Sequence, residues 1–187
     1  MTGPIWRRIA LGAGLLAAGL AYAVDADQPL RAVPRVDLAR YMGDWYEVAR
    51  YPNRHQRGLV GVVASYRLND DGTIEVTNTA RKGRLDGEQE ISTASAWVND
   101  GSNNAKWTVQ FFWPFKAPYW IIDLGKDYEY AVVGQPKRKY LWILCRKPQM
   151  DPETYAAICK RLRQQGYDPA KLQRTPQPKP DPPKDAS

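Results

Sequence analysis

The chain has 187 residues, of which 43% are hydrophobic and 25% charged, the balance of one ordinary globular domain. Its formal charge of +7 is scattered in short groups such as Arg81-Lys82 and Lys160 to Arg163. Nucleic-acid binding requires charge gathered on one face, so a nucleic acid is not expected as partner, although a weak attraction to anionic lipid headgroups remains.

Residues 1–23 have the pattern of a secretory signal peptide. Two arginines precede an apolar run from Ile9 to Leu20, and Ala21-Tyr22-Ala23 is a small-x-small cleavage site. The run is too short to span a bilayer comfortably, so we predict cleavage after Ala23, with an uncleaved amphiphilic anchor as the alternative. No cysteine lies near this site to carry the lipid of a bacterial lipoprotein, so we expect a periplasmic protein without that anchor.

Residues 43–146 are predicted to form eight antiparallel strands. Alternating runs are separated by hairpin signals such as Asn69-Asp70-Asp71-Gly72. The predicted strands are 43–51, 59–68, 73–80, 88–98, 105–112, 119–124, 127–134 and 140–146, with a loop at 114–118. Such spacing is typical of a closed barrel or a sandwich, and an eight-stranded up-and-down barrel is just wide enough to hold one small ligand. The charged connection at 51–58 is expected to lie over one mouth of the barrel.

One C-terminal helix is predicted after the last strand. Asp151 suits the N-cap, Pro152 the first helical position, and Gly166 the end of the helix. An apolar stripe that should cover the outside of the sheet comprises Tyr155, Ile158, Cys159 and Leu162. The domain is therefore expected at 36–174, after an N-terminal extension at 24–35 and before a proline-rich disordered tail at 175–187.

The only two cysteines are Cys145 and Cys159. In an oxidising compartment an even count favours a disulfide, and two buried free thiols are the alternative. Cys145 lies on the strand face opposite to Trp142, and Cys159 lies on the helix stripe. If the helix packs on the outside of the barrel, the two cysteines meet and Trp142 points inward.

Three stretches resemble the signature regions of the lipocalin family. They are Gly43-Asp44-Trp45 at the first strand, Lys126-Asp127-Tyr128 at the turn into the seventh, and Arg146 at the end of the eighth. The middle motif is usually Thr-Asp-Tyr, so Lys126 is a mild departure. The stretches YMGDWYEVARYPNRHQRG and FFWPFKAPYWIIDLGKDYEYAVV further resemble the bacterial lipocalin and apolipoprotein D branch, and the resemblance covers residues 36–174.

The resemblance implies structural roles for Gly43, Trp45, Asp127, Tyr128 and Arg146. Trp45 would plug the closed end of the barrel, with Arg146 across its ring in a cation–π contact. Gly43 would let a short helical turn pass close to the first strand. Ligands would then enter at the other end.

Alternation along the strands predicts the side chains that line the barrel. The predicted ligand-binding residues are Tyr66, Val76, Asn78, Trp97, Trp107, Val109, Phe111, Tyr130, Val132, Tyr140 and Trp142. This aromatic lining suits an acyl chain, unless the rings fill the barrel and leave no cavity. Arg54, Arg57 and Lys116 lie on loops that would rim the mouth and attract a carboxylate or phosphate, with solvated loop charge as the alternative.

The sequence carries no recognisable catalytic motif. His55 is the only histidine, which argues against a zinc site and a Ser-His-Asp relay. Neither a nucleophile elbow nor a phosphate-cradling glycine loop occurs. We therefore predict a protein that is not an enzyme and holds neither metal nor cofactor.

The leading hypothesis is non-covalent binding, storage or transport of a fatty acid, lysophospholipid or similar amphiphile. The resemblance suggests a role in envelope maintenance under stress. The second hypothesis is an enzyme acting on lipids or isoprenoids, with Tyr66 or Tyr130 as proton donor. The third is an interaction protein that uses its tail or a barrel face. The sequence is compatible with a monomer or a homodimer.

Overall fold

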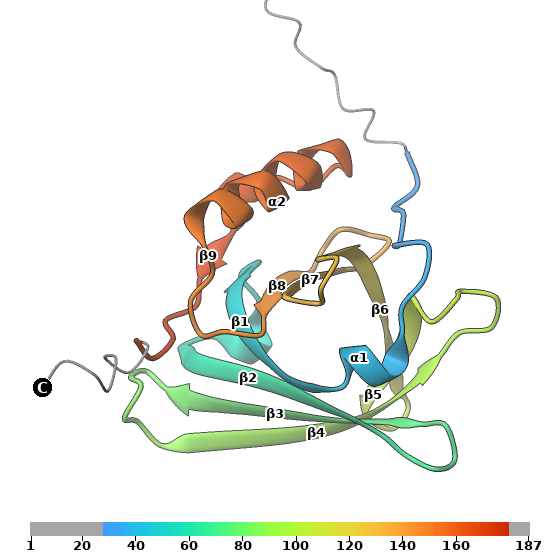
Figure 1. Ribbon diagram of the computed structural model, residues 1–187. Coiled ribbons are helices and arrows are strands. Elements are labelled where there is room, and N and C mark those ends of the chain that lie inside the picture. The colour runs from blue at the N-terminus through green and yellow to red at the C-terminus, as the bar shows by residue number, and fades with distance from the viewer. Residues whose placement is uncertain (1–27, 180–187) are drawn as a thin grey trace, which may run out of the picture.

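Eight antiparallel strands close into a barrel in the computed structural model, which describes residues 28–179 (Figure 1). The strands are β1 (Gly43–Arg50), β2 (Leu59–Leu68), β3 (Ile74–Lys82), β4 (Gln89–Val98), β5 (Lys106–Phe112), β6 (Phe115–Leu124), β7 (Tyr130–Gly134) and β8 (Leu141–Cys145). Each strand pairs with the next, β8 pairs with β1, and the pairing of β1 with β2 closes the barrel. The predicted fold class is thus confirmed, while the predicted signal peptide at 1–23 lies outside the described residues.

The two largest differences from the predicted strand boundaries are at the starts of β6 and β7. Strand β6 begins at Phe115, inside the predicted loop, since Phe112 pairs with Phe115 across a short hairpin. Strand β7 begins only at Tyr130, because Tyr128 has a φ of +61° and belongs to a turn. That turn is closed by the Gly125 amide, which donates to the Tyr130 carbonyl at 2.9 Å.

The short helix α1 (Leu38–Tyr41) and Trp45 close one end of the barrel. The Trp45 ring is fully buried, and its Nε1 donates to the Tyr41 carbonyl at 2.8 Å. The Arg146 guanidinium lies 3.8 Å from the centroid of that ring and donates to the carbonyls of Met42 and Asp44, each at 2.8 Å. Arg146 therefore joins the end of β8 to the start of β1 across the closed end.

Gly43 has a φ of +88°, in the left-handed region that favours glycine. A Cβ at this position would lie 3.5 Å from Arg146 Nη1, an ordinary contact, so backbone conformation is the main requirement for glycine. In the second motif the Tyr128 hydroxyl accepts from the Asp37 amide at 2.8 Å, and Arg40 lies over the Tyr128 ring. The turn at 125–129 thus holds the chain just before α1.

Helix α2 (Pro152–Gln164) packs on the outside of the barrel (Figure 1). Asp151 caps it by accepting from the Thr154 amide at 2.8 Å. The helix buries Ile158 and Leu162 in a second apolar cluster with the outward side chains of β7 and β8. Within residues 28–179, no helix is both long and apolar enough to cross a membrane.

The disulfide predicted between Cys145 and Cys159 is not formed in the structure, where both are free thiols. Cys145 lies in the cluster beneath α2, and its sulfur accepts a weak hydrogen bond from the Lys147 amide at 3.5 Å. The Cys159 thiol lies beside Tyr155, whose hydroxyl pKa is raised by burial and by this thiol. The two sulfurs thus have separate neighbours, which corresponds to the alternative of two thiols.

The chain after Leu172 is ordered as far as the structure describes it, contrary to the predicted disorder. Strand β9 (Gln173–Arg174) pairs with β1, and the next residues continue along the barrel wall. Thr175 and Gln177 are buried, with 6% and 7% of their surfaces exposed. Composition predicted a solvated tail here, but the polar side chains find buried partners that only the folded barrel provides.

This C-terminal strap, residues 173–177, fills a gap between β1 and β2. Those strands pair only from Gly43–Tyr66 to Tyr46–Val63 and then separate. In the gap the Thr175 amide donates to Val48 O at 2.9 Å, and Gln177 Nε2 donates to Glu47 O at 2.9 Å and Val62 O at 2.8 Å. The strap therefore provides hydrogen-bond partners for backbone groups of β1 and β2 where these two strands no longer pair with each other.

Candidate ligand-binding site

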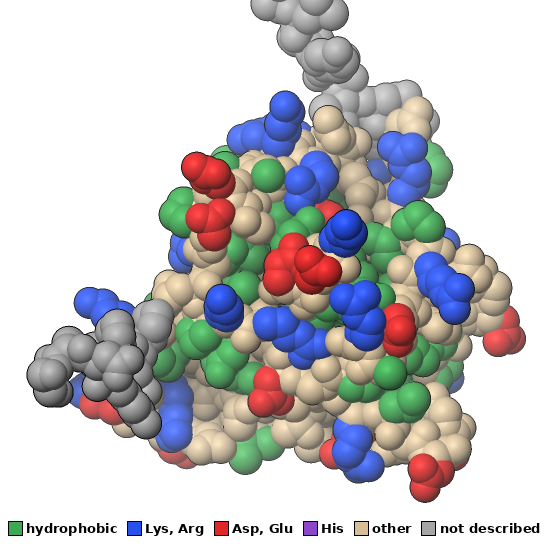
Figure 2. Space-filling model, viewed as in Figure 1, with side chains coloured by type: hydrophobic (Ala, Val, Ile, Leu, Met, Phe, Trp, Pro, Cys, Tyr) green, Lys and Arg blue, Asp and Glu red, His purple; other side chains and the backbone are tan. Residues whose placement is uncertain are grey.

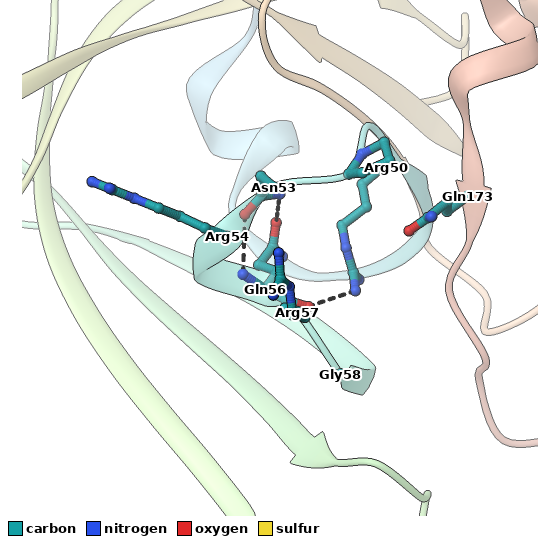
Figure 3. A pocket seen from close by; sticks show the side chains of 8 residues that line it. Arg50, Asn53, Arg54, Gln56, Arg57, Gly58 and Gln173 are labelled. Atoms are coloured by element: carbon teal, nitrogen blue, oxygen red, sulfur yellow. Dashed lines mark hydrogen bonds between the residues drawn. The ribbon is translucent and has the colours of Figure 1, made fainter.

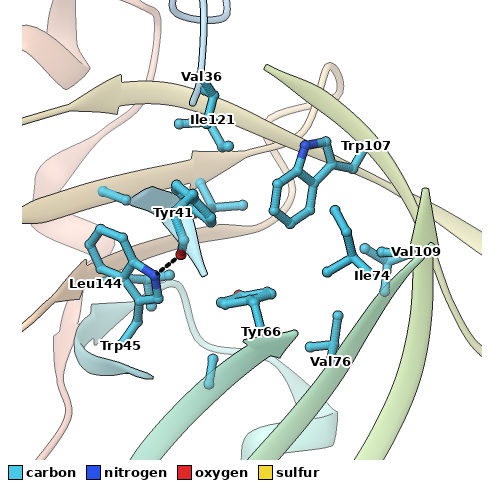
Figure 4. Close-up of a cluster of buried hydrophobic side chains, with 14 of the residues drawn as sticks. Val36, Tyr41, Trp45, Tyr66, Ile74, Val76, Trp107, Val109, Ile121 and Leu144 are labelled. Atoms are coloured by element: carbon cyan, nitrogen blue, oxygen red, sulfur yellow. Dashed lines mark hydrogen bonds between the residues drawn. The ribbon is translucent and has the colours of Figure 1, made fainter. Parts of the chain in front are cut away.

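The base of the barrel is packed with aromatic rings (Figure 4). Trp107 is fully buried and stacks on Tyr119, with centroids 5.0 Å apart. The Tyr119 hydroxyl lies 2.8 Å from the Tyr41 hydroxyl and 2.9 Å from that of Tyr66, in a hydrogen-bonded trio. Burial raises the pKa of Tyr66 to about 12, so these hydroxyls stay protonated at physiological pH.

Above this base, solvent reaches the inward face of the sheet. Ile74 and Ala96 form a fully buried cross-strand pair at the base. The inward pair at the level of the mouth is Asn78 with Ser92, of which Asn78 is half-buried and Ser92 exposed. All four side chains point into the barrel, so its inward face is closed to solvent near α1 and exposed at Ser92, although Ala80, the next inward residue of β3 toward the mouth, is again buried.

The structure places most of the predicted lining on the inward face. The inward residues of the predicted set are Tyr66, Val76, Asn78, Trp107, Val109 and Trp142. Tyr140 stacks on Trp142 near the mouth, with an interplanar angle of 6°. The base therefore holds Tyr66 and Trp107, while Asn78, Tyr140 and Trp142 belong to the upper part.

Trp97 was assigned to the wrong face, because it points outward. The pairs Ala96–Val109 and Val98–Trp107 carry the inward side chains, which leaves Trp97 on the other face. There the Lys116 ammonium lies 4.8 Å from its ring centroid. If the inward positions of a strand are assigned one residue out of step, every side chain is placed on the wrong face of the sheet. In β4 the small alanines, rather than the large Trp97 ring, face the interior.

Tyr130 and Val132 were likewise assigned to the wrong face. The interior receives Ala131 and Val133, whereas Tyr130 and Val132 pack beneath α2. The Tyr130 hydroxyl accepts from Arg161 Nη2 at 2.9 Å on that outer side. Both faces of β7 are apolar, so its sequence shows no alternation from which the inward-facing residues could have been identified.

Phe111 lies at the rim rather than in the lining, with 49% of its surface exposed. A register shift between Val109 and Phe112 interrupts the alternation there. Together with Phe112, Trp113 and Phe115, which are 63%, 86% and 67% exposed, it forms an exposed aromatic tip between β5 and β6. In an up-and-down barrel this connection lies at the same end as the β1–β2 loop, which is the open end.

A buried polar cluster near the mouth was missed by sequence reasoning. The buried polar or charged residues of the described chain are Glu47, Arg50, Thr175 and Gln177. A register shift between Glu47 and Ala49 lets Glu47 and Arg50 face the same side, where they form an ion pair. The Thr175 hydroxyl donates to Glu47 Oε1 at 2.5 Å. One sequence signal could have indicated that Glu47 is buried: it lies two residues after Trp45, so both side chains are on the same face of the strand.

The same carboxylate holds the loop over the mouth. Gln56, in the short 3₁₀ helix η1 (Arg54–Gln56), donates to Glu47 Oε2 at 2.7 Å and accepts from Trp142 Nε1 at 2.8 Å. Arg50 Nη2 donates to Gln56 O at 2.7 Å and to Leu59 O at 3.0 Å. The β1–β2 loop is therefore tied both to the inner wall of the barrel and, through Glu47, to the C-terminal strap.

Two surface cavities flank this loop. The first, of about 370 Å³, is lined by Arg50, Pro52, Asn53, Arg54, Gln56, Arg57, Gly58 and Gln173 (Figure 3). The second, of about 560 Å³, is lined by Tyr51, Pro52, Arg138, Lys139, Ala170, Lys171, Leu172 and Gln173. Both are basic and share Pro52 and Gln173. By contrast, basic and acidic side chains are interspersed on the face shown in Figure 2.

A barrel with a plugged base, an open mouth and one external helix defines a class of protein that encloses small hydrophobic molecules. A family profile described as "Lipocalin-like domain" matches residues 36–177, and the chain belongs to the lipocalin family. Membership in this family implies the binding of small hydrophobic ligands.

Characterised relatives include plant, bacterial and animal lipocalins. The chain is 40% identical over 157 residues to temperature-induced lipocalin-1 of Arabidopsis thaliana, covering 79% of this chain and 83% of the relative. It is 36% identical over 169 residues to outer membrane lipoprotein Blc of Escherichia coli K12, covering 89% and 95%. It is 35% identical over 151 residues to mouse apolipoprotein D, covering 75% and 77%.

Solved structures share the fold at lower sequence identity. Insecticyanin from the tobacco hornworm Manduca sexta superposes with a TM-score of 0.64 at 18% identity, covering 79% of this chain and 84% of that one. Lobster apocrustacyanin A1 gives 0.60 at 19% identity, covering 75% and 79%. These likenesses show the architecture alone.

Proposed function

We propose that the protein binds a fatty acid, lysophospholipid or similar amphiphile in the barrel and stores or transports it. The observation that carries this proposal is the change in exposure along the inward face of β4, from fully buried Ala96 to exposed Ser92, which we take as the wall of a hollow open at the end opposite α1. An acyl chain in such a hollow is stabilised by about 0.8 kcal/mol per buried methylene. Asn78 and the Tyr140 hydroxyl supply hydrogen-bonding groups nearer the mouth.

A pair of tryptophan substitutions tests the location of the ligand. Ser92 and Thr93 are both exposed neighbours on β4, but Ser92 faces the hollow and Thr93 faces outward. Ser92→Trp should weaken oleate binding by at least about tenfold, or ~1.4 kcal/mol, because the indole occupies the hollow. Thr93→Trp adds the same ring outside and should leave affinity unchanged.

Binding is measured by titration with oleate and by native mass spectrometry. Trp142, near the mouth, and Trp107, at the base, are the tryptophans inside the barrel that should report occupancy, whereas Trp45 plugs its closed end. Equal affinities for the two variants would place the ligand elsewhere. Failure of the wild-type protein to take up any acyl lipid would refute the proposed function.

We also propose a periplasmic location and a role in maintaining membrane lipids. The relatives named outer membrane lipoprotein Blc support an envelope setting, as does the predicted signal peptide. Fractionation of cells producing the full chain tests the location. Recovery of the mature protein in the cytoplasm would contradict it.

The aromatic tip supports a peripheral contact with membranes. Trp113 is 86% exposed, and the amphipathic tryptophan ring is suited to a membrane–water interface. Trp113→Ser should lower sedimentation with phosphatidylethanolamine–phosphatidylglycerol vesicles. Ile91→Ser, which removes a 58% exposed side chain from the barrel wall, is the control and should not change it.

The hypothesis that the protein is an enzyme named Tyr66 and Tyr130 as possible proton donors. Tyr130 does not fit this role, because its side chain lies outside the barrel. Tyr66 remains inside, but burial raises its pKa to about 12, and its hydroxyl is bonded to Tyr119. The lipocalin family consists in general of binding and transport proteins. A lipid panel incubated with the protein and with Tyr66→Phe would reveal any turnover.

A further inference from the structure

We propose that the β1–β2 loop is an anion site that takes the phosphate or carboxylate headgroup of the bound amphiphile. The inference rests on the proposed function and names the class of ligand as anionic rather than zwitterionic. Three observations support this proposal: arginines line the first cavity, two of them form no ion pair within residues 28–179, and the cavity adjoins the barrel interior.

The cavity beside the loop is lined by three arginines and no carboxylate. The charge of Arg50 is already matched, because Arg50 is paired with buried Glu47. The ion pairs found in residues 28–179 involve neither Arg54 nor Arg57. Two guanidinium groups on one short loop thus carry positive charge that no side chain of the described protein neutralises.

These two guanidinium groups are free to reach a ligand. Both side chains are exposed, and within residues 28–179 the only hydrogen bond that Arg54 makes with a side chain is a long one, 3.4 Å from Nε to His55 Nε2. In Figure 3 the Arg54 side chain extends away from the loop on the side opposite to Gln173. A planar guanidinium donates two parallel hydrogen bonds to a carboxylate or phosphate, which matches the proposed headgroup.

The loop itself is fixed, so the arginines start from a defined scaffold. Asn53 caps the turn by accepting from the Gln56 amide at 3.0 Å, and Gln56 is bonded to Glu47 and Trp142. An anchored loop loses less conformational entropy on binding than a mobile one.

Gln56 also connects the cavity with the hollow. Its side chain lines the cavity and contacts the Trp142 indole, and Trp142 packs against the inward cluster of the barrel. A headgroup beside the loop and an acyl chain inside the barrel are therefore separated by little more than one glutamine side chain.

The second cavity extends the positive surface on the other side of Pro52 and Gln173. Its lining includes Arg138, Lys139 and Lys171 and again no carboxylate. A rim of one sign attracts anions and disfavours cationic headgroups. Lys116, expected from the sequence to share this role, lines neither cavity and lies over Trp97 instead.

The test compares two lysolipids with the same oleoyl chain, lysophosphatidylglycerol and lysophosphatidylcholine, at fixed ionic strength. The wild-type protein should bind the anionic lipid about tenfold more tightly, a difference of ~1.4 kcal/mol. In the double variant Arg54→Gln/Arg57→Gln this preference should fall to about twofold, with affinity for the zwitterionic lipid unchanged. That unchanged affinity also shows that the variant is folded.

Arg84→Gln is the matched control. Arg84 lies on another loop at the open end, is exposed and pairs with Asp86, and it lines neither cavity. It removes one positive charge, so the preference for the anionic lipid should persist. If Arg84→Gln lowers the preference as much as the double variant does, net charge rather than a site is responsible, and the proposal is overturned.

Inorganic phosphate separates the two sources of an anion. Millimolar phosphate should weaken lysophosphatidylglycerol binding in the wild-type protein but not in the double variant. Phosphate binding as tight as that of the lysolipid would assign the site to a free anion and overturn the headgroup assignment. If neither lysolipid nor oleate binds, the proposed function fails, whereas equal binding of both lysolipids refutes only the anion site.

Discussion

Replacing Glu47 with alanine should destabilise the barrel far more than removing an exposed carboxylate. Glu47 is 2% exposed and contacts Arg50, Gln56 and Thr175 through its carboxylate. Its removal leaves Arg50, a residue that is 8% exposed, buried without a counter-charge. Breaking a buried ion pair in this way costs about 3–5 kcal/mol, a large part of the ~5–15 kcal/mol that holds a typical domain folded.

The control is Glu75→Ala, which removes one partner of an exposed pair. The side chains of Arg67 and Glu75 are 66% and 43% exposed, so the loss should be at most about 1 kcal/mol. Urea unfolding followed by tryptophan fluorescence gives both free energies of unfolding. The reasoning is refuted if Glu47→Ala loses no more stability than Glu75→Ala, since the cluster would then be energetically incidental.

Three further predictions concern the strap, the helix and the base. Thr175→Val should cost about 1–3 kcal/mol in urea unfolding, because it removes one of the hydrogen bonds that the buried Glu47 carboxylate accepts, and Thr175→Ser should restore most of it. Ile158→Ala should cost about 2–5 kcal/mol in the same assay, since this fully buried side chain fills the contact between α2 and the barrel. The pKa of Tyr66 is raised to about 12 by burial, so its contribution is complete below pH 10 and disappears between pH 10 and 12. Circular dichroism and tyrosinate absorbance should therefore change together in that range, and ionisation of the buried tyrosines with the fold intact would contradict it.

The barrel was predictable because strands and turns leave local signals. Turn residues marked most of the strand boundaries, and Asp151 and Pro152 marked the start of α2. The faces of the strands were predictable only where polar and apolar residues alternate. Strand β3 shows such alternation from Ile74 to Thr77, whereas β7 is apolar on both faces and gave the wrong assignment for Tyr130.

The candidate site was partly predictable for the same reason. Trp107, Val109 and Trp142 follow from alternation, but Trp97 does not, because the pairing of β4 with β5 decides its face. The ordered strap could not be predicted from composition, because a proline-rich, polar segment is expected to be solvated. It is ordered because the gap between β1 and β2 provides its hydrogen-bond partners, and that gap forms only in the folded barrel. The disulfide was predicted because the strand and the helix that carry the two cysteines lie side by side. In the structure the two thiols have different neighbours and are free.

The sequence by itself determined the number and order of the barrel strands and the external helix, because these depend on residues close together in the chain. The plug formed by Trp45 and Arg146 was implied by the resemblance to the lipocalins, since these residues lie far apart in the sequence. Only the tertiary structure decided that Glu47 is buried, that Gln56 and Thr175 meet on its carboxylate, and that Arg54 and Arg57 form no ion pair with the part of the chain that the structure describes. A buried polar group requires partners, and those partners come from β1, the mouth loop and the C-terminal strap, which become neighbours only when the barrel closes.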